Sequence, residues 1–356
     1  MDKLPEQYFL LSEQETVKKI KDIKRKYGSG LVILGHHYEQ DLIVELSDLK
    51  GDSFALAKMA SEQEKAEHIV FCGVYFMAEA ARILAKPAQT VYLPNHTAGC
   101  PLADFADIES AEKAWTEMQE YIDTEKVIPA CYMNSSADIK AFCGEHGGIV
   151  CTSSNAEKIF RWAFEQGEKL FFMPDEQLGR NTAAKLGVDE IMVWDKSKHL
   201  GGNTAEQIKN AKIIVWKGYC HVHALKFTIE NVKQLREKYP GIKIVVHPEC
   251  TPDVVNACDA AGSTSFIIDY VKDAPKDSVI GIGTELNMVN RLYNEYKGEK
   301  TIVPVNSSIC PDMMKISVYH LLYCLENLVS GDFAVEVNDN VIINARKALE
   351  RMLEVG

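Results

Sequence analysis

The stretch "LVILGHHYE" (Leu31–Glu39) changes character at its midpoint. It begins as a short apolar run with β-branched residues at two positions, the kind of run that is buried in a parallel β-strand. It ends in two histidines, a tyrosine and a glutamate. Open α/β sheets bind ligands beyond the carboxyl ends of their strands. The stretch therefore predicts a buried strand that delivers polar side chains to a functional edge.

Apolar runs of the same kind recur along the chain and alternate with helical segments. The segment from Ser12 to Gly28 predicts a helix, because it opens with the capping-box pattern Ser12…Glu15 and closes on glycine. The later apolar runs are "HIVFCGV", "TVYLP", "KVIPACYM", "KLFFMP", "EIMVW", "KIIVW", "IKIVVHP", "SVIGIG" and "TIVPV". Strands that alternate with helices predict an α/β protein with parallel sheets.

Three copies of one unit become visible when these segments are aligned. The copies run from "LVILGHHYEQ" to "TVYLPNHTAGCPLAD", from "KVIPACYMNSS" to "KIIVWKGYCHVH", and from "IKIVVHPECT" to "TIVPVNSSICPDM". Each contains a strand, a hydroxyl-rich helix start, a strand with an acid-bearing turn and helix, and a strand that ends in a cysteine loop. We therefore expect an α/β fold of three repeated Rossmann-like parallel-sheet domains, each an αβα sandwich, in pseudo-threefold arrangement around a central site.

The spacing within the copies supports this interpretation. The interval from the first polar strand-end residue to the terminal cysteine is 64 residues in the first copy, 63 in the third and 88 in the second. The excess in the second copy corresponds to "VDEIMVWDKSKHLGGNTAEQIKNAK", which predicts an added strand and helix. The predicted domains are 18–102 together with C-terminal helices at 311–356, then 103–223 with the inserted strand and helix, and 224–310.

The terminal cysteines of the three copies are candidates for one metal site. They are Cys100, Cys220 and Cys310. If the strand ends face a common axis, these thiols converge. Three thiolates without a fourth equivalent suggest either zinc with three sulfur ligands or an iron–sulfur cluster with one open iron. Ligands from three domains span more space than one small ion easily bridges, so the cluster is favoured; its open iron can act as a Lewis acid in dehydration.

The other cysteines have no counterparts in the repeat and are expected to be structural. They are Cys72, Cys131, Cys143, Cys151, Cys250, Cys258 and Cys324. His221 and His223 alternate with Val222 beside one of the candidate ligands, a pattern that favours structural hydrogen bonds over metal ligation.

Hydroxyl groups recur at the helix starts of the three copies, at Ser53, Ser153 and Thr264. Each can cap its helix, which every helix needs, or donate to a bound anion where free N–H groups and the helix dipole attract negative charge. The threefold repetition beside strand ends favours anion binding. His36 and His247, at equivalent strand ends, titrate near neutrality and can donate or shuttle protons.

Composition narrows the class of partner. The chain has 356 residues and a formal net charge of -12, which argues against a nucleic-acid footprint and favours small-molecule or protein partners. Neither a membrane-spanning stretch nor a signal peptide is apparent, so we expect a cytoplasmic protein without membrane contact. Ten cysteines in such a chain are not expected to form a disulfide framework, because the cytosol keeps thiols reduced.

Eleven motifs, in order, resemble the quinolinate synthase (NadA) family of NAD biosynthesis. They are "GHHYE", "GDS", "GVYFMAEAARIL", "AGCPLAD", "YMNSSA", "CTSSNA", "WKGYCHVH", "VVHPEC", "AGSTS", "IGTE" and "CPDMM". The resemblance extends from about Gly28 to about Leu322 and shows no departure at the positions that matter. Some members carry extra cysteines near the third ligand, a redox switch that "SSICPDMM", with one cysteine, does not support.

The resemblance implies condensation of iminoaspartate with dihydroxyacetone phosphate to quinolinate, with loss of phosphate and water. It also implies a [4Fe-4S] cluster on Cys100, Cys220 and Cys310. Substrate contacts carry over to His36, Ser53, Tyr132, Met133, Asn134, Ser153, His247, Pro248, Glu249 and Thr264, and catalytic roles to Tyr38, Glu249 and His247. Glu249 is the natural general base, and the phenol of Tyr38 or Tyr132 a candidate acid. Transient contact with the enzyme that produces the imine is a further expectation.

Two other functions share parts of this pattern. One is an iron–sulfur hydro-lyase that acts on another hydroxy acid, which would not require the phosphate group. The other is a non-catalytic cluster-binding redox sensor, which would leave the helix-start hydroxyls and Glu249 without a purpose. Product analysis with dihydroxyacetone phosphate separates the first of these from a quinolinate synthase.

Overall fold

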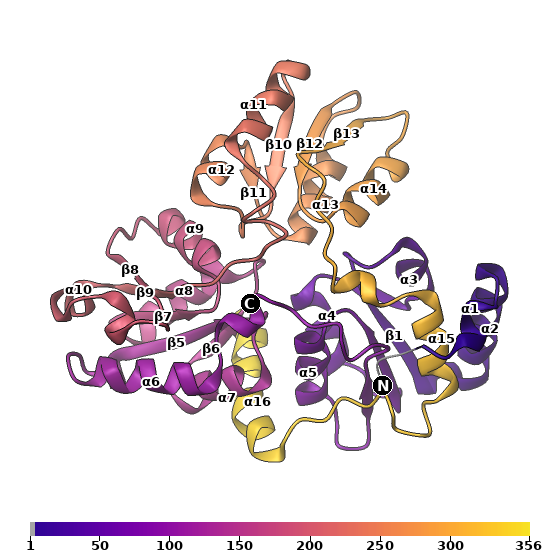
Figure 1. Ribbon diagram of the computed structural model, residues 1–356, viewed down its shortest axis with the longest axis horizontal. Coiled ribbons are helices and arrows are strands. Elements are labelled where there is room, and N and C mark those ends of the chain that lie inside the picture. Colours follow the sequence, from indigo (N-terminus) through magenta and orange to yellow (C-terminus); the bar gives the residue numbers. More distant parts are fainter. Residues whose placement is uncertain (1–3) are drawn as a thin grey trace. The chain divides into compact units, whose positions relative to one another are not determined.

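The computed structural model describes residues 4–356 and contains three parallel β-sheets with helices on their faces (Figure 1). The first sheet has the order β2-β1-β3-β4. Its strands are β1 (Leu31–His36), β2 (Leu49–Gly51), β3 (His68–Cys72) and β4 (Thr90–Tyr92). All six residues of β1 are buried, as expected for a parallel strand that is covered on both faces.

The second and third sheets repeat this order. The second is β6-β5-β7-β9-β8 and the third is β11-β10-β12-β13. The strands of the second are β5 (Val127–Tyr132), β6 (Ile149–Cys151), β7 (Lys169–Met173), β8 (Ile191–Trp194) and β9 (Ile213–Trp216). Those of the third are β10 (Lys243–Val246), β11 (Ala260–Ala261), β12 (Val279–Gly283) and β13 (Thr301–Pro304). The common order confirms the predicted α/β fold of three Rossmann-like copies.

The helices connect these strands. Those before and within the first copy are α1 (Glu6–Phe9), α2 (Glu13–Tyr27), α3 (Asp41–Leu46), α4 (Ser53–Ser61) and α5 (Tyr75–Leu84). The second copy has α6 (Ile108–Gln119), α7 (Ala137–Glu145), α8 (Ala156–Gln166), α9 (Glu176–Leu186) and α10 (Ala205–Asn210). The third copy and the C-terminal segment have α11 (Ile229–Lys238), α12 (Pro252–Ala257), α13 (Thr264–Asp273), α14 (Leu286–Glu295), α15 (Val318–Glu326) and α16 (Asp339–Val355).

Each predicted apolar run is a strand, and three further strands were not predicted. The unpredicted ones are β2, β6 and β11, which have two or three residues each and pair with the first strand of their copy. Strands this short cannot display a hydrophobic period, so only the pairing reveals them. The insertion expected in the second copy is confirmed as β8 and α10.

The chain divides into two compact units. Unit 1 contains the chain up to Cys100 with Glu285–Arg291 and Ile309–Val337; unit 2 contains Pro101–Thr284, Leu292–Ser308 and Asn338–Gly356. The predicted domain boundaries remain a prediction, with one difference at the C-terminal segment. Helix α15 packs against α2 in unit 1, but α16 packs against α7 and β6 in unit 2 (Figure 1).

A close approach explains why α16 lies on α7. A Cβ atom at Gly144 of α7 would overlap the carbonyl oxygen of Asn344, so the contact requires glycine. The apolar face of α16 is buried there through Ala345, Ala348 and Leu349. Helical periodicity could predict that face but not the surface that it covers.

Candidate functional site

The loops after β1 and β10 form the same turn. In the first, the backbone N–H of Tyr38 donates to Nδ1 of His36 at 3.1 Å; in the other, the N–H of Glu249 donates to Nδ1 of His247 at 3.4 Å. Both histidines are 3% exposed. Tyr38 and Glu249, the two acid–base candidates, therefore occupy equivalent positions of their copies.

Glu249 lies in a buried polar cluster within unit 2. Its Oε2 is 2.6 Å from Nδ1 of His223 and 3.7 Å from Nδ1 of His247, and it accepts a hydrogen bond from Tyr132. The rings of His223 and His247 stack with centroids 4.3 Å apart, and Nε2 of His223 is 3.1 Å from Oγ1 of Thr284. His223 thus makes hydrogen bonds through both ring nitrogens, as the alternation with Val222 favoured.

The neighbours of Glu249 decide its charge. Burial alone would raise the pKa of its carboxyl, but His247, His223 and the hydrogen bonds from His223 and Tyr132 outweigh burial and hold that pKa well below its usual range. Burial, followed by the charge of Glu249 and the hydrogen bond to it, raises the pKa of the Tyr132 phenol. The cluster therefore holds an ionised carboxylate beside a protonated phenol, the charge states that a base and an acid require.

A second carboxyl group near Glu249 behaves in the opposite way. Asp175 is fully buried, its Oδ1 accepts the N–H of Leu178 at the start of α9, and its Oδ2 has no hydrogen-bond partner. Burial and then the charge of Glu249 raise the pKa of Asp175. Two neighbouring buried carboxyl groups do not both ionise readily, so the protonated form of Asp175 is favoured.

The equivalent loop of unit 1 contains the buried carboxyl group of Glu39, and a second carboxyl group near it, that of Glu285, comes from the loop after β12. Neither carboxyl oxygen of Glu39, which is fully buried, has a hydrogen-bond partner. Burial, assisted by Glu285, raises its pKa, which Arg291 lowers only in part. Burial also raises the pKa of Glu285 to about 7, although N–H groups of Asn287, Met288 and Cys310 donate to it. Burial thus favours the protonated form of Glu39, in contrast to Glu249.

The helix-start hydroxyls are not needed as caps in two of the three copies. Asp52 caps α4 and Ser263 caps α13, so Ser53 and Thr264 are the first residues of their helices. The hydroxyl of Thr264, which is 3% exposed, has no hydrogen-bond partner. A hydroxyl in this state at a helix N-terminus is available to an anion, which supports the binding role over capping.

A cavity of about 180 Å³ lies beside these groups in unit 2. It is lined by Ser153 and Ser154 before α8, by Ser263 before α13, by Pro248, and by Asn181 and Lys185 of α9. Two helix N-termini and one lysine line this small cavity next to the Glu249 loop, together with one carboxylate, that of Glu157. The helix N-termini and Lys185 favour a small anionic molecule there, and Glu157 opposes it.

The candidate cysteine ligands differ from most other cysteines in exposure. Cys100, Cys220 and Cys310 are partly exposed, as is Cys258, whereas the remaining six are buried. The sulfur of Cys310 accepts backbone N–H groups of Met313 and Asp312, although burial raises the pKa of its thiol to about 12. N–H donors around a loop cysteine suit a metal thiolate, whose ionisation a bound cation promotes. Cys100 and Cys310 lie in unit 1 and Cys220 in unit 2.

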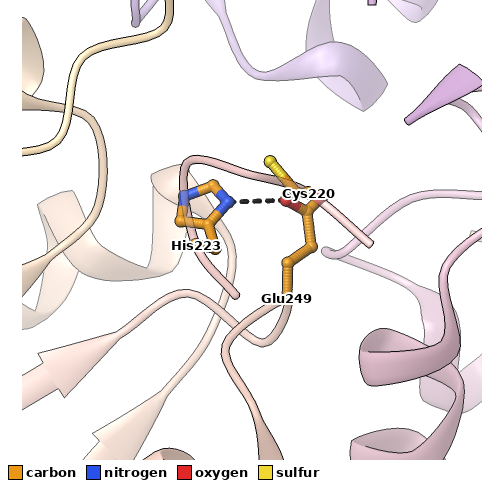
Figure 2. Close-up of side chains that lie close together, drawn as sticks. All are labelled: Cys220, His223 and Glu249. Atoms are coloured by element: carbon orange, nitrogen blue, oxygen red, sulfur yellow. Dashed lines mark hydrogen bonds and ion pairs between the residues drawn. The ribbon is translucent and has the colours of Figure 1, made fainter. Parts of the chain in front are cut away.

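Cys220 also belongs to a mixed group of metal-binding side chains. Its thiol, His223 and Glu249 place one potential ligand atom each within 4.8 Å of one another, and Figure 2 shows the sulfur beside the hydrogen bond between the other two. Sequence patterns missed this group because Glu249 comes from another loop.

Comparison with known proteins identifies the family. The chain matches the family described as Quinolinate synthetase A protein (NadA) over residues 18–354. The chain belongs to this family. Curated relatives include the quinolinate synthase of Lysinibacillus sphaericus (strain C3-41), 45% identical over 98% of the chain and 96% of that protein, and that of Bacillus pumilus (strain SAFR-032), 45% identical over 98% and 95%. The quinolinate synthase of Corynebacterium glutamicum is 45% identical over 99% of the chain and 90% of that protein.

Membership in the NadA family confirms the resemblance seen in the motifs and the prediction that the chain is an enzyme. Within residues 4–356, no helix combines the length and apolarity needed to span a membrane. The NadA family name does not itself assign a role to any residue, so the roles of the residues described above belong to the proposal below.

Proposed function

We propose that this protein is a quinolinate synthase that condenses iminoaspartate with dihydroxyacetone phosphate, releases phosphate and water, and serves NAD biosynthesis. The observation that carries the proposal is the environment of Glu249, a buried carboxylate kept ionised beside a protonated tyrosine at the carboxyl ends of parallel strands. Ring formation requires proton removal and proton delivery to departing groups. Nothing in a purely structural role requires this separation of charge states.

We assign proton removal to Glu249. His223 and His247 stabilise its charge, and Tyr132 donates to it. The phenols of Tyr132 and Tyr38 are the candidate proton donors. We assign to His247 the transfer of a proton to or from the carboxylate; its Nδ1 lies 3.7 Å from Oε2 of Glu249.

The anionic groups of the substrates are assigned to the strand-end loops and helix starts. The proposed contacts are His36, Ser53, Tyr132, Met133, Asn134, Ser153, His247, Pro248, Glu249 and Thr264. The unpartnered hydroxyl of Thr264 and the cavity beside Ser153 support this assignment in unit 2. Helix N-termini can attract carboxylate and phosphate groups without a cluster of lysines, which suits a chain of net charge -12.

We assign the [4Fe-4S] cluster to Cys100, Cys220 and Cys310. When bound, it supplies an iron without a protein thiolate that acts as a Lewis acid toward a substrate oxygen. Their partial exposure and their equivalent places in the three copies support this ligand set. The N–H groups that point at the Cys310 sulfur also support it.

One observation favours a different metal chemistry. The group of Cys220, His223 and Glu249 offers sulfur, nitrogen and oxygen ligands, which a single zinc ion accepts. Such an ion would not need Cys100 or Cys310. Loss of bound metal in Cys310→Ser therefore favours the cluster, and full retention favours the single ion.

The test is quinolinate formation by anaerobically purified protein supplied with iminoaspartate and dihydroxyacetone phosphate. We expect brown protein with about four iron and four sulfide ions per chain, and quinolinate only when both substrates are present. Turnover of another hydroxy acid without the phosphate ester would replace the proposal with a hydro-lyase. A bound cluster without any turnover would leave a redox sensor.

A further inference from the structure

Asn181 contacts the backbone on both sides of Glu249, the proposed base. Its side chain lies in α9, is 5% exposed, and donates through Nδ2 to the carbonyl oxygens of Pro248 and Cys250, both at 2.8 Å. These two carbonyls belong to the residues immediately before and after Glu249. One buried amide group therefore holds the backbone on both sides of a single side chain.

Arg291 does the same for Tyr38. Its guanidinium donates to the carbonyl oxygen of Glu39 at 2.8 Å and to that of His37, the residues that flank Tyr38, and it also pairs with Asp41 at 2.9 Å. The fork of an arginine suits two acceptors that lie side by side. All five residues belong to unit 1.

The two donors occupy the same position in their copies. Asn181 follows the buried acid Asp175 by six residues, and Arg291 follows the buried acid Glu285 by six; each acid stands two residues after the third strand of its copy, β7 or β12. The first copy has Ala80 at that position in α5, which offers no donor. Asn181 and Arg291 thus occupy the same helix position in two copies, and each donates to the carbonyls that flank an acid–base candidate. Unrelated polar residues on a helix surface would not be expected to share both features.

We propose that Asn181 and Arg291 are equivalent positioning residues, each of which fixes the backbone on both sides of one acid–base side chain, Glu249 or Tyr38. The proposal rests on the proposed function for the roles of those two side chains, but the ties themselves do not. The loops lack strand or helix at these residues, so the ties replace the hydrogen bonds that would otherwise hold them. A displacement of about 1 Å at a reacting group can reduce a rate about 100-fold.

The variants are Asn181→Leu and Arg291→Met, which remove the donors at similar volume. We expect kcat to fall about 100-fold in both variants, with the iron content unchanged. KM for both substrates should stay unchanged in Arg291→Met, whereas Asn181→Leu also alters the cavity that Asn181 lines. Arg291→Lys keeps a charge and donors, and should recover part of the loss. Should Asn181→Leu fail to fold, Asn181→Ser takes its place, with a smaller expected loss because a hydroxyl can still donate one hydrogen bond.

Two matched controls separate positioning from general stability. Thr16→Val removes a buried hydroxyl from α2, where it donates to the carbonyl oxygen of Ser12 at the start of the same helix. Arg236→Gln removes another guanidinium that donates to a carbonyl, that of Ala257. Both controls should leave kcat within about twofold, the range of surface substitutions away from special features.

A second measurement asks whether each donor acts through its partner. If Asn181 works only through Glu249, the double variant Asn181→Leu, Glu249→Gln should be no slower than Glu249→Gln alone, because the two act as one unit. Multiplied losses would overturn the positioning role, as would a rise in KM with unchanged kcat.

Hydrogen exchange provides a readout that does not depend on activity. Peptides that cover 247–250 should exchange faster in Asn181→Leu, and peptides that cover 36–39 faster in Arg291→Met, with no change in the controls. Unchanged exchange in the matching loop overturns the inference whatever the reaction is. Faster exchange in a protein that makes no quinolinate supports the ties and rejects the proposed function alone.

Discussion

The loops after β1 and β10 share a backbone turn but hold their carboxyl groups in opposite charge states. Glu249 is surrounded by two histidines and a tyrosine and is ionised, whereas Glu39 has no hydrogen-bond partner on either oxygen, lies near Glu285 and retains its proton. Both residues are buried, Glu39 at 0% and Glu249 at 2% exposed. The groups supplied by other segments, rather than burial or the local backbone, therefore decide whether the carboxyl group of each loop is ionised.

The largest expected effect concerns the cysteine loops that accompany the two regions. Cys310 belongs to unit 1 with the first loop and Cys220 to unit 2 with the other. If both serve one cluster with Cys100, serine at any of these three positions should abolish it, because the repeat supplies no fourth equivalent thiolate. Iron, sulfide and visible absorbance measure the result.

Cys258→Ser is the matched control, since Cys258 is also partly exposed, and Cys72→Ser tests a buried cysteine. Both should retain the cluster. Unchanged iron content in one of the first three variants would remove that residue from the ligand set.

The next effect distinguishes the two glutamates by rate. Glu249→Gln should lower the rate of quinolinate formation by about 10²–10⁴-fold, the usual contribution of a general base. The amide keeps an oxygen that His223 and Tyr132 can donate to, so the variant should still fold and keep its cluster. Near-normal turnover would exclude the catalytic role, and equal losses in activity, melting temperature and cluster would indicate a structural one.

The same substitution in the first loop should change stability in the opposite direction. The pKa of Glu39 lies above its usual value of 4.5 in the folded protein, so the folded state binds the extra proton and stability falls as pH rises beyond 4.5. Glu39→Gln removes that penalty. The melting temperature of the variant should therefore exceed that of the parent protein by more at pH 8 than at pH 5, with roughly 2–4 °C for each kcal/mol of stability. Thermal melts across this range measure it.

The effect of pH on stability should have the opposite sign for Glu249. Its folded-state pKa is lowered, so its contribution to stability is present above the usual value of 4.5 and is lost as pH falls through the folded value. Glu249→Gln should therefore lose stability at neutral pH and approach the parent protein in acid. If stability changed with pH in the same direction in both glutamine variants, the two glutamates would not differ in charge state.

The smallest effect concerns the helix starts in the two regions. Thr264→Val and Ser53→Ala each remove a hydroxyl from the first residue of a helix. We expect about a tenfold rise in KM for one substrate, the size of one hydrogen bond to a charged group, with unchanged kcat. Ser263→Ala, which removes the cap of α13 instead, should lower stability by about 1 kcal/mol; a larger loss of stability in Thr264→Val than in this control would restore a capping role.

Much of the scaffold was predictable from local patterns. All ten apolar runs are strands, and the insertion in the second copy is a strand and a helix. Burial on both faces imposes continuous apolar runs, and such runs are visible without any knowledge of their partners. The place of α16 was not predictable, because an amphipathic helix specifies a buried face but not the surface that buries it.

The candidate site was predictable in part. Tyr132 and Glu249 were expected at strand ends and Thr264 at a helix start, and they lie there, whereas Ser153, also expected at a helix start, lies in the turn before α8. Asp175 and Glu285 could have been found by aligning the acid-bearing turns of the copies. Asn181 and Arg291 could not, because a polar helix residue resembles any surface residue until its partners, 67 or more positions away, are known.

By itself the sequence determined the threefold repeat, the strands and the order of the polar and cysteine loops, since these follow from hydrophobic period and spacing along the chain. Only the tertiary structure decided which carboxyl groups are ionised and which loops are tied. The pKa of a buried group depends on the charges and donors within a few ångströms of it. For Glu249 those groups include His223, which the fold brings from another copy, and for Glu39 they include Glu285, which lies 246 positions further along the chain.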